Sequence, residues 1–431
     1  MKTTAPDRQT APACFPLPIP SIPRPETERL ANGVELTCFE NSAQGLVALD
    51  LVFPGRSADA STRETEGLVY KLLTEGTGKK TAKQLADAFS LIGASFEVTH
   101  HADYDRVSVS CLTRFFPQVL GLMEEVWSEA VYPDKEWKTV QETQLRQHEI
   151  SLKKTSFLAS RLYREVLFGG GNAYGYSFNP EWIGALEAQA IREVYARLKT
   201  VGPALALLAG HARAEDKKRL REWLASFSGV RNLYPESGPG TAGPAPGIHW
   251  APLDDSTQAS LRMGNFTIGP DHPDSPILGL ALEIFGGYFG SRLMSNIRED
   301  KGWTYGIYAQ RVAMLRQSYW VVVSDVKSEN VLDAVEEIRR EARMLCEERV
   351  PEEELETVKN YLRGQFLSAI THCFAQAERY REAWILGLTL DDLEEREAHI
   401  AGAGSLQVQE IARRYLNADQ AVVALSGKKP A

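Results

Sequence analysis

An internal repeat of about 200 residues constrains the fold of this 431-residue chain more than any other feature. The segments "TSFLASRLYRE" and "HCFAQAERYRE" align so that Tyr163 and Tyr380 stand 217 residues apart. Shorter matches precede them in the same order. Near the start of the repeat the offset between the two copies is 209, and Gly93 aligns with Gly302. A unit of this length is a domain rather than one turn of a solenoid. The sequence therefore predicts a duplicated domain.

The segment Asn232–Gly247, "NLYPESGPGTAGPAPG", separates the two copies. It is rich in proline and glycine and has no hydrophobic periodicity, which is typical of an interdomain linker. The first residues are also proline-rich and lack an apolar signal-peptide core. We predict an extended arm at 1–22, an N-terminal domain at 23–231, the linker at 232–247 and a C-terminal domain at 248–431.

Each copy shows the same succession of hydrophobic patterns. In the first, "LVALDLVF" alternates like a half-buried strand, and "TAKQLADAFSLIG" has a Thr N-cap and a Gly stop, as helices do. A strand hairpin, long helices over 116–130 and from 134 to about 168, and the buried strand "ALALLAG" complete the copy. The second copy repeats this order. We expect an α+β fold of two homologous sandwich domains, with mostly antiparallel sheets covered by helices.

Charge and cysteine content exclude several classes of protein. The net charge of −9 and the pI near 5.6 disfavour nucleic acid and anionic membranes as partners. Five scattered cysteines without CxxC spacing indicate reduced thiols rather than a disulfide framework. No apolar run reaches the roughly 18 residues that a membrane span needs. We expect a cytoplasmic protein, although export by a route without a visible signal stays open.

Conventional catalytic motifs are missing. The loop "GTGKKT" fails the Walker pattern, because Lys80 stands where a magnesium-binding Ser or Thr is needed. The adjacent His100 and His101 lie on a predicted strand, so their side chains leave opposite faces and cannot share one metal ion. Neither H-x-x-E-H nor a serine nucleophile elbow occurs in the chain.

The stretch "IREDKGWTYGIYA" is the remaining candidate. Gly302 is expected to end a helix in the left-handed conformation, with Trp303 and Tyr305 on the strand that follows. At the offset of 209, Arg298 answers Phe89 and Tyr305 answers Phe96. One copy thus builds the turn with two phenylalanines and the other with a guanidinium and a phenol. Folding explains the glycine, but it does not explain that asymmetry.

At this point the chain resembles the pitrilysin-type metallopeptidases, the family of insulysin and the mitochondrial processing peptidase. The resemblance covers about Pro23 to Gly427 and includes the two homologous halves, the linker and the specific signature "FGGYFGSRLMSNIREDKGWTYGIYA". In this family an Arg and a Tyr of the C-terminal half close over the substrate, and Arg298 and Tyr305 match those positions. Trp303 and Gly302 are then expected beside the bound peptide.

The family's zinc motif, H-x-x-E-H with a distal Glu, is degenerate in this chain. Aligned on the following Gly-Thr, its two histidines fall on Gly67 and Lys71 and its general base falls on Tyr70. The distal ligand falls on Glu149, and a supporting acid falls on Glu142. A catalytic zinc site needs three protein ligands, so we expect no metal in this chain.

The resemblance therefore implies the zinc-free subunit of a heterodimeric peptidase. The other subunit would carry H-x-x-E-H and zinc, and this chain would supply Arg298 and Tyr305 to bind the peptide and stabilise the oxyanion. The alternative is a non-enzymatic scaffold that kept the fold for assembly. A self-sufficient hydrolase ranks last, because no nucleophile constellation is present. Whether the chain also forms a homodimer is left open.

Overall fold

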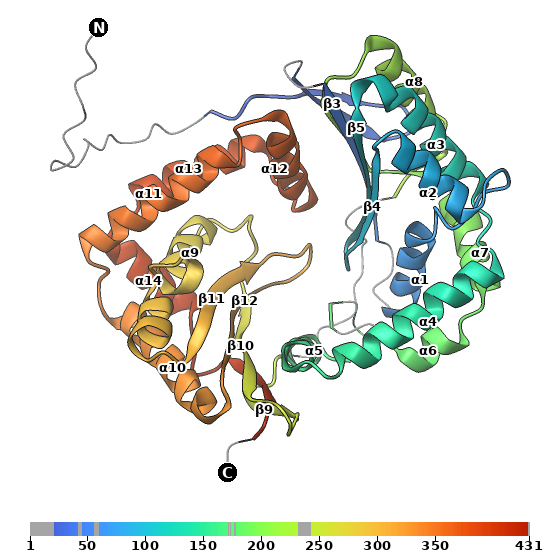
Figure 1. The fold of residues 1–431 in the computed structure, drawn as a ribbon. Helices are drawn as coiled ribbons and strands as arrows, with labels where there is room; N and C mark the ends of the chain where they lie inside the picture. Colours follow the sequence, from blue (N-terminus) through green and yellow to red (C-terminus); the bar gives the residue numbers. More distant parts are fainter. Residues whose placement is uncertain are drawn as a thin grey trace, which may run out of the picture.

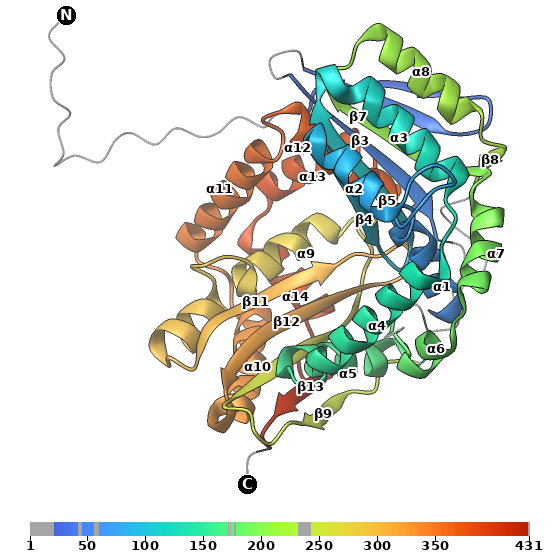
Figure 2. The ribbon, with the colours of Figure 1, turned by 45° about the vertical axis from the view of Figure 1, so that its right-hand side comes forward.

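The computed structural model describes residues 21–41, 45–55, 60–170, 172, 174–175, 178–231 and 243–429. Two large sheets face one another across the middle of the molecule, and helices enclose them (Figures 1 and 2). Residues 1–20 of the expected arm and most of the expected linker lie outside the described residues, whereas Ile22 at the end of the arm is buried. The domain boundaries drawn from the sequence stay a prediction.

The two sheets have the same strand order, as a duplication requires. The first follows the order β1-β2-β7-β3-β5-β4 and the second the order β9-β13-β10-β12-β11, so that only β1 lacks a counterpart. The strands of the first sheet are β1 (Glu26–Arg29), β2 (Glu35–Glu40), β3 (Leu46–Pro54), β4 (Ser95–His100), β5 (Tyr104–Leu112) and β7 (Leu205–Gly210). Those of the second are β9 (Gly247–Pro252), β10 (Gln258–Thr267), β11 (Thr304–Val312), β12 (Ser318–Lys327) and β13 (Val422–Gly427).

Strand directions also match between the sheets. β2 runs parallel to β7, and β9 runs parallel to β13. All other neighbours in the two sheets are antiparallel. A short parallel pair, β6 (Val201–Gly202) and β8 (Gly229–Val230), stands apart. The fold class predicted from the sequence is confirmed.

Helices cover both faces of each sheet. The outer faces carry α1 (Ala60–Lys71), α2 (Ala82–Leu91) and α3 (Phe116–Glu129) on the first sheet and α9 (Ser275–Leu282) and α10 (Val331–Glu347) on the second. The remaining helices are α4 (Asp134–Ser151), α5 (Thr155–Phe168), α6 (Pro180–Ala185), α7 (Ala188–Leu198), α8 (Ala214–Ala225), α11 (Glu352–Ser368), α12 (Cys373–Ile385), α13 (Leu390–Gly402) and α14 (Ser405–Tyr415). The long helix expected from 134 to about 168 is in fact α4 and α5, separated at Leu152–Lys154.

The two halves exchange one helix each. α5, which belongs to the first half of the sequence, packs on β9, β10 and β13 of the second sheet. α12, its counterpart in the repeat, packs on β2 and β7 of the first sheet. The segments whose sequences match most closely, "TSFLASRLYRE" and "HCFAQAERYRE", are therefore the ones that join the halves.

Equivalent tyrosines make the cross-contacts. The buried Tyr163 donates a hydrogen bond of 3.2 Å to the carbonyl oxygen of Trp320, on the second sheet. Tyr380 donates one of 2.9 Å to Glu35 on the first sheet and packs edge-on against Phe39. Each exchanged helix thus places an aromatic ring and a hydroxyl group against the sheet of the other half.

Local turns match the sequence expectations. Gly93 and Gly302, the aligned glycines of the repeat, have φ angles of +59° and +64°, so both adopt the left-handed conformation that ends a helix. Thr81 caps α2 by accepting a hydrogen bond from the backbone of Gln84. Across the described ranges, none of the helices is both long and apolar enough to cross a bilayer.

Gly264 tests the packing of β10 against both β12 and α5. A Cβ atom at this position of β10 would lie 1.9 Å from the Trp320 carbonyl oxygen and 2.7 Å from the Tyr163 hydroxyl. We expect Gly264→Ala to lower the free energy of unfolding by about 1–3 kcal/mol, measured by urea titration. Gly364→Ala is the control, because nothing lies within 4 Å of its Cβ position in α11. Equal stability of the two variants would contradict this packing.

Candidate functional site

The segment before Gly302 is a π-helix, Met294–Asp300, rather than the end of an α-helix. The amide of Lys301 donates to the carbonyl of Asn296, five residues back, at 3.1 Å. The side chain of Asn296 fixes the segment to α10 by hydrogen bonds to Glu337 and Glu341. These contacts hold the backbone that carries Arg298.

A bulge follows directly after the turn. Thr304 pairs with Val326 and Ile307 pairs with Ser324, so β11 contains one extra residue. The regular alternation expected along this strand is therefore broken. Because of the bulge, Tyr305 points into solvent with 91% of its surface exposed, while Ile307 is fully buried. A large aromatic residue so exposed contributes little to the core.

Arg298 lies against the backbone of this bulge. Its Nε donates a hydrogen bond of 3.1 Å to the carbonyl oxygen of Tyr305, and its guanidinium group stacks over the ring of Phe289 at 4.5 Å. About a third of the side chain stays exposed. Within the described residues the hydroxyl of Tyr305 bonds to no protein group. The pair thus presents an exposed phenol and, against the backbone of the same residue, a partly exposed guanidinium group.

The first half builds the same turn from apolar side chains. Phe89 on α2 and Phe96 on β4, the counterparts of Arg298 and Tyr305, place their rings 5.5 Å apart. Phe89 is buried there. The asymmetry noted in the sequence is therefore an asymmetry between a packed pair and an exposed polar pair.

Trp303 has a structural role in this conformation. It lies just before β11 and packs against the core of the second half, and its carbonyl accepts a hydrogen bond from Lys327. Direct contact of Trp303 or Gly302 with a bound peptide stays a prediction.

Another side chain fills the space beside the first zinc-motif position. Gly67 is buried in α1, and a Cβ atom there would lie 2.2 Å from Nδ1 of His100. That imidazole is held in place by Asp105, whose carboxylate lies 2.6 Å from the same nitrogen. A histidine at position 67 would therefore overlap His100.

The other two positions of the motif are equally unsuited to zinc. Tyr70 is buried and stacks on Phe53 with 5.0 Å between ring centroids, and burial raises the pKa of its hydroxyl. Lys71 carries a cation and lies 4.0 Å from Glu64. Neither the aromatic ring nor the ammonium group is a zinc ligand under these conditions.

The distal carboxylates do not compensate for these changes. Glu142 and Glu149 are exposed on α4. The described part of the chain contains no group of three or more His, Cys, Asp or Glu side chains that could hold a metal ion. The residues at the motif positions therefore do not fit a zinc ion.

Sequence analysis missed the ion network that surrounds these positions. Arg63, buried in α1, pairs with Asp105 at 2.7 Å and donates to the backbone carbonyls of His101 and Ala102. The other ring nitrogen of His100 lies 3.7 Å from Glu64. The sequence places Arg63 on the helix that aligns with the zinc motif. It does not show which residues the guanidinium group contacts.

The Arg298–Tyr305 pair lies far from these positions. The hairpin after β11 reaches the first half, where the amide of Leu315 donates to Asp103 at 3.2 Å. With a rise of about 3.3 Å per residue, Tyr305 lies roughly 20 Å from that end of the strand. Residues of both halves, among them His100 and Arg311, line a cavity of 720 Å³ at the junction. This chain therefore does not assemble the pair and the motif positions into one site.

Gly67 and His100 make a testable pair. Gly67→Ala should displace the imidazole and lower the free energy of unfolding by about 1–3 kcal/mol. In the background of His100→Ala the same change should cost at least about 1 kcal/mol less, because the clash is gone. A double-mutant cycle by chemical denaturation measures the coupling. Additive effects would show that the glycine is not required by the imidazole.

Comparisons with known proteins agree with this geometry. Residues 186–362 match the Peptidase M16 inactive domain. An "uncharacterized zinc protease", YmxG of Bacillus subtilis (strain 168), is 20% identical over 403 residues, which are 92% of this chain and 96% of that protein.

Two solved structures share the fold over almost their whole length. A peptidase M16 inactive domain from Pseudomonas fluorescens superposes with a TM-score of 0.83 at 20% identity, covering 94% of this chain and 99% of that one. A protease from Helicobacter pylori gives a TM-score of 0.79 at 13% identity and coverages of 95% and 100%. The resemblance to the pitrilysin-type, or M16, peptidases is thus confirmed, and residues 186–362 match the inactive domain of that family.

Proposed function

We propose that this chain is the zinc-free subunit of a heterodimeric M16 peptidase and binds peptide substrates together with a zinc-bearing subunit. One observation carries the proposal. The family's zinc positions are filled by groups that cannot bind zinc, whereas the Arg298–Tyr305 pair is exposed and held in place. A scaffold would have no use for a fixed guanidinium group beside a solvent-facing phenol.

The two side chains would have distinct tasks. The Tyr305 hydroxyl would donate a hydrogen bond to the scissile carbonyl oxygen as negative charge develops there, which is an oxyanion-stabilising contribution. Arg298 already bonds to the Tyr305 carbonyl through Nε, and one terminal nitrogen lies 3.7 Å from Glu299, so the other terminal nitrogen would reach a substrate carbonyl. The zinc-bearing subunit would supply the hydrolytic chemistry.

The partner is identified by co-purification. We expect the tagged chain, isolated from its own cells, to carry a subunit of similar length that contains H-x-x-E-H, and zinc to follow that subunit when the two are separated. The separated chain should be inactive on peptides and should recover activity only on mixing. Peptidase activity of the separated chain, or its recovery solely with a membrane complex, would overturn the proposal.

Substitutions in the pair test its role. Tyr305→Phe should lower kcat of the mixed complex by about 10²–10³-fold, the usual effect of losing one oxyanion donor. Arg298→Ala should lower kcat/KM while the complex still assembles by gel filtration. Tyr415→Phe and Arg349→Ala, which change the same residue types at distant positions, should leave activity unchanged. Equal activity of Tyr305→Phe and Tyr415→Phe would exclude the assigned role.

A further inference from the structure

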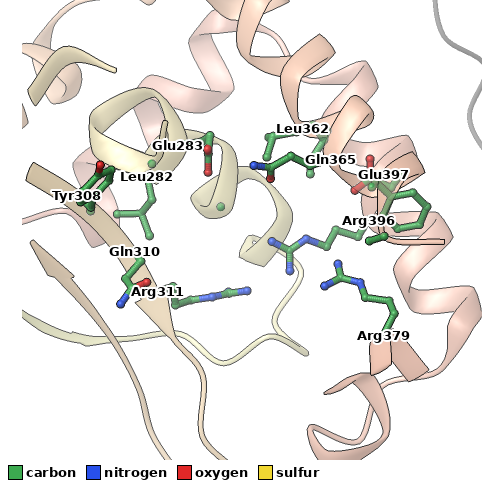
Figure 3. Close-up of a pocket in the computed structure, with 16 residues that line it drawn as sticks. Leu282, Glu283, Tyr308, Gln310, Arg311, Leu362, Gln365, Arg379, Arg396 and Glu397 are labelled. Atoms are coloured by element: carbon green, nitrogen blue, oxygen red, sulfur yellow. The ribbon is translucent and has the colours of Figure 1, made fainter. Parts of the chain in front are cut away.

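A second cavity, of 540 Å³, lies inside the C-terminal half beside β11 (Figure 3). Its walls come from α9, the π-helical segment Glu283–Gly287, β11, α11, α12 and α13. Tyr308 and Gln310 of β11 line it, three and five residues after Tyr305. The cavity therefore adjoins the strand that carries the exposed phenol.

Three guanidinium groups point into this cavity from three different elements, Arg311 from β11, Arg379 from α12 and Arg396 from α13 (Figure 3). Arg311 donates to the hydroxyl of Ser275 at 2.6 Å. Arg379 reaches Glu382 at 3.4 Å, but its buried Nε has no hydrogen-bond partner.

Arg396 is the least satisfied of the three. It makes no hydrogen bond or ion pair with any described residue. Its guanidinium group lies close to the backbone of α9, since a Cβ atom at Gly279 would come within 2.7 Å of it. Because it is only partly exposed and has no partner, this guanidinium group is free to bind an anion in the cavity.

The electrostatics of the cavity favour an added anion. Burial, together with the charge of the nearby Arg396, lowers the pKa of Arg311 to about 10. Burial and the charge of Arg379 likewise lower the pKa of Arg396. Two carboxyl groups, Glu283 and Glu397, also line the cavity, and burial raises the pKa of both.

We propose that this cavity binds a carboxylate of the peptide substrate, through Arg311, Arg379 and Arg396. The planar guanidinium group presents two parallel donors that match a carboxylate. The ligand class follows from the position of the cavity, because β11 is the outermost strand of its sheet and an extended peptide passing Tyr305 would run beside it. The carboxylate would then lie roughly three to six residues from the cleaved bond.

A carboxylate fits this cavity better than a phosphate group. Glu283 and Glu397 line the same space and would repel a dianion more strongly than a monoanion. An acidic side chain and a free C-terminus offer the same chemistry, so the experiment must separate them. The inference rests on the proposed function only in assuming that the chain binds peptides.

The test measures peptide binding to this chain alone, without the zinc subunit, by calorimetry. Three peptides of the sequence acetyl-Ala-Thr-Val-Thr-Ala-X are compared, with X as Glu amide, Gln free acid or Gln amide. We expect the carboxylate-bearing peptides to bind about 10-fold more tightly than the neutral amide. The first two peptides show whether a side chain or a C-terminus is preferred.

Substitutions locate the effect. Arg396→Gln and, separately, Arg379→Gln should remove the preference while leaving weak binding of the neutral peptide. Arg349→Gln, which removes an exposed arginine outside the cavity, should leave the preference for carboxylate peptides unchanged. Circular dichroism and thermal melting confirm that each variant is folded.

Three results would overturn the proposal. The first is equal affinity for the charged and neutral peptides, and the second is no binding of any of the peptides. The third is tighter binding of inorganic phosphate than of the carboxylate peptide, measured by displacement of that peptide. None of them depends on heterodimer assembly. A failure here would therefore leave the role of Arg298 and Tyr305 to be judged by the activity of the mixed complex.

Discussion

The reciprocal packing of α5 and α12 is the interaction on which the rest of the structure depends. Each helix leaves its own half and covers the inner face of the other sheet, so neither sheet completes its core without the other half. Tyr163 and Tyr380 add hydrogen bonds from the helices to those sheets. The contact fixes the distance between the sheets, and with it the cavity at their junction.

This arrangement decides what the chain can do alone. The degenerate motif and the Arg298–Tyr305 pair lie at well-separated places, and the exchanged helices α5 and α12 pack each half against the sheet of the other. A second subunit of the same fold would have to bring a metal site to the exposed phenol. This separation is what supports the proposed division of labour between two subunits.

Much of the fold could be predicted from the sequence because duplication leaves a local record. Gly93 and Gly302 align in sequence and share a left-handed conformation. What could not be predicted is which surface each helix covers, because an amphipathic pattern shows that α5 is half-buried without naming its partner. The bulge at Tyr305 was missed for a similar reason, since it depends on pairing with β12.

The polar groups of the site were the hardest to predict. Arg63 and Arg396 both lie on helices, where an arginine ordinarily reaches solvent. Their environments are created by distant segments, the strand hairpin at His100–Asp105 for one and helices α9 and α12 for the other. In the first case Asp105 and two backbone carbonyls satisfy the charge. In the second case the charge is not satisfied. The chain has a net charge of −9, yet three arginines converge on one cavity, and their mutual repulsion destabilises the fold unless an anion is bound.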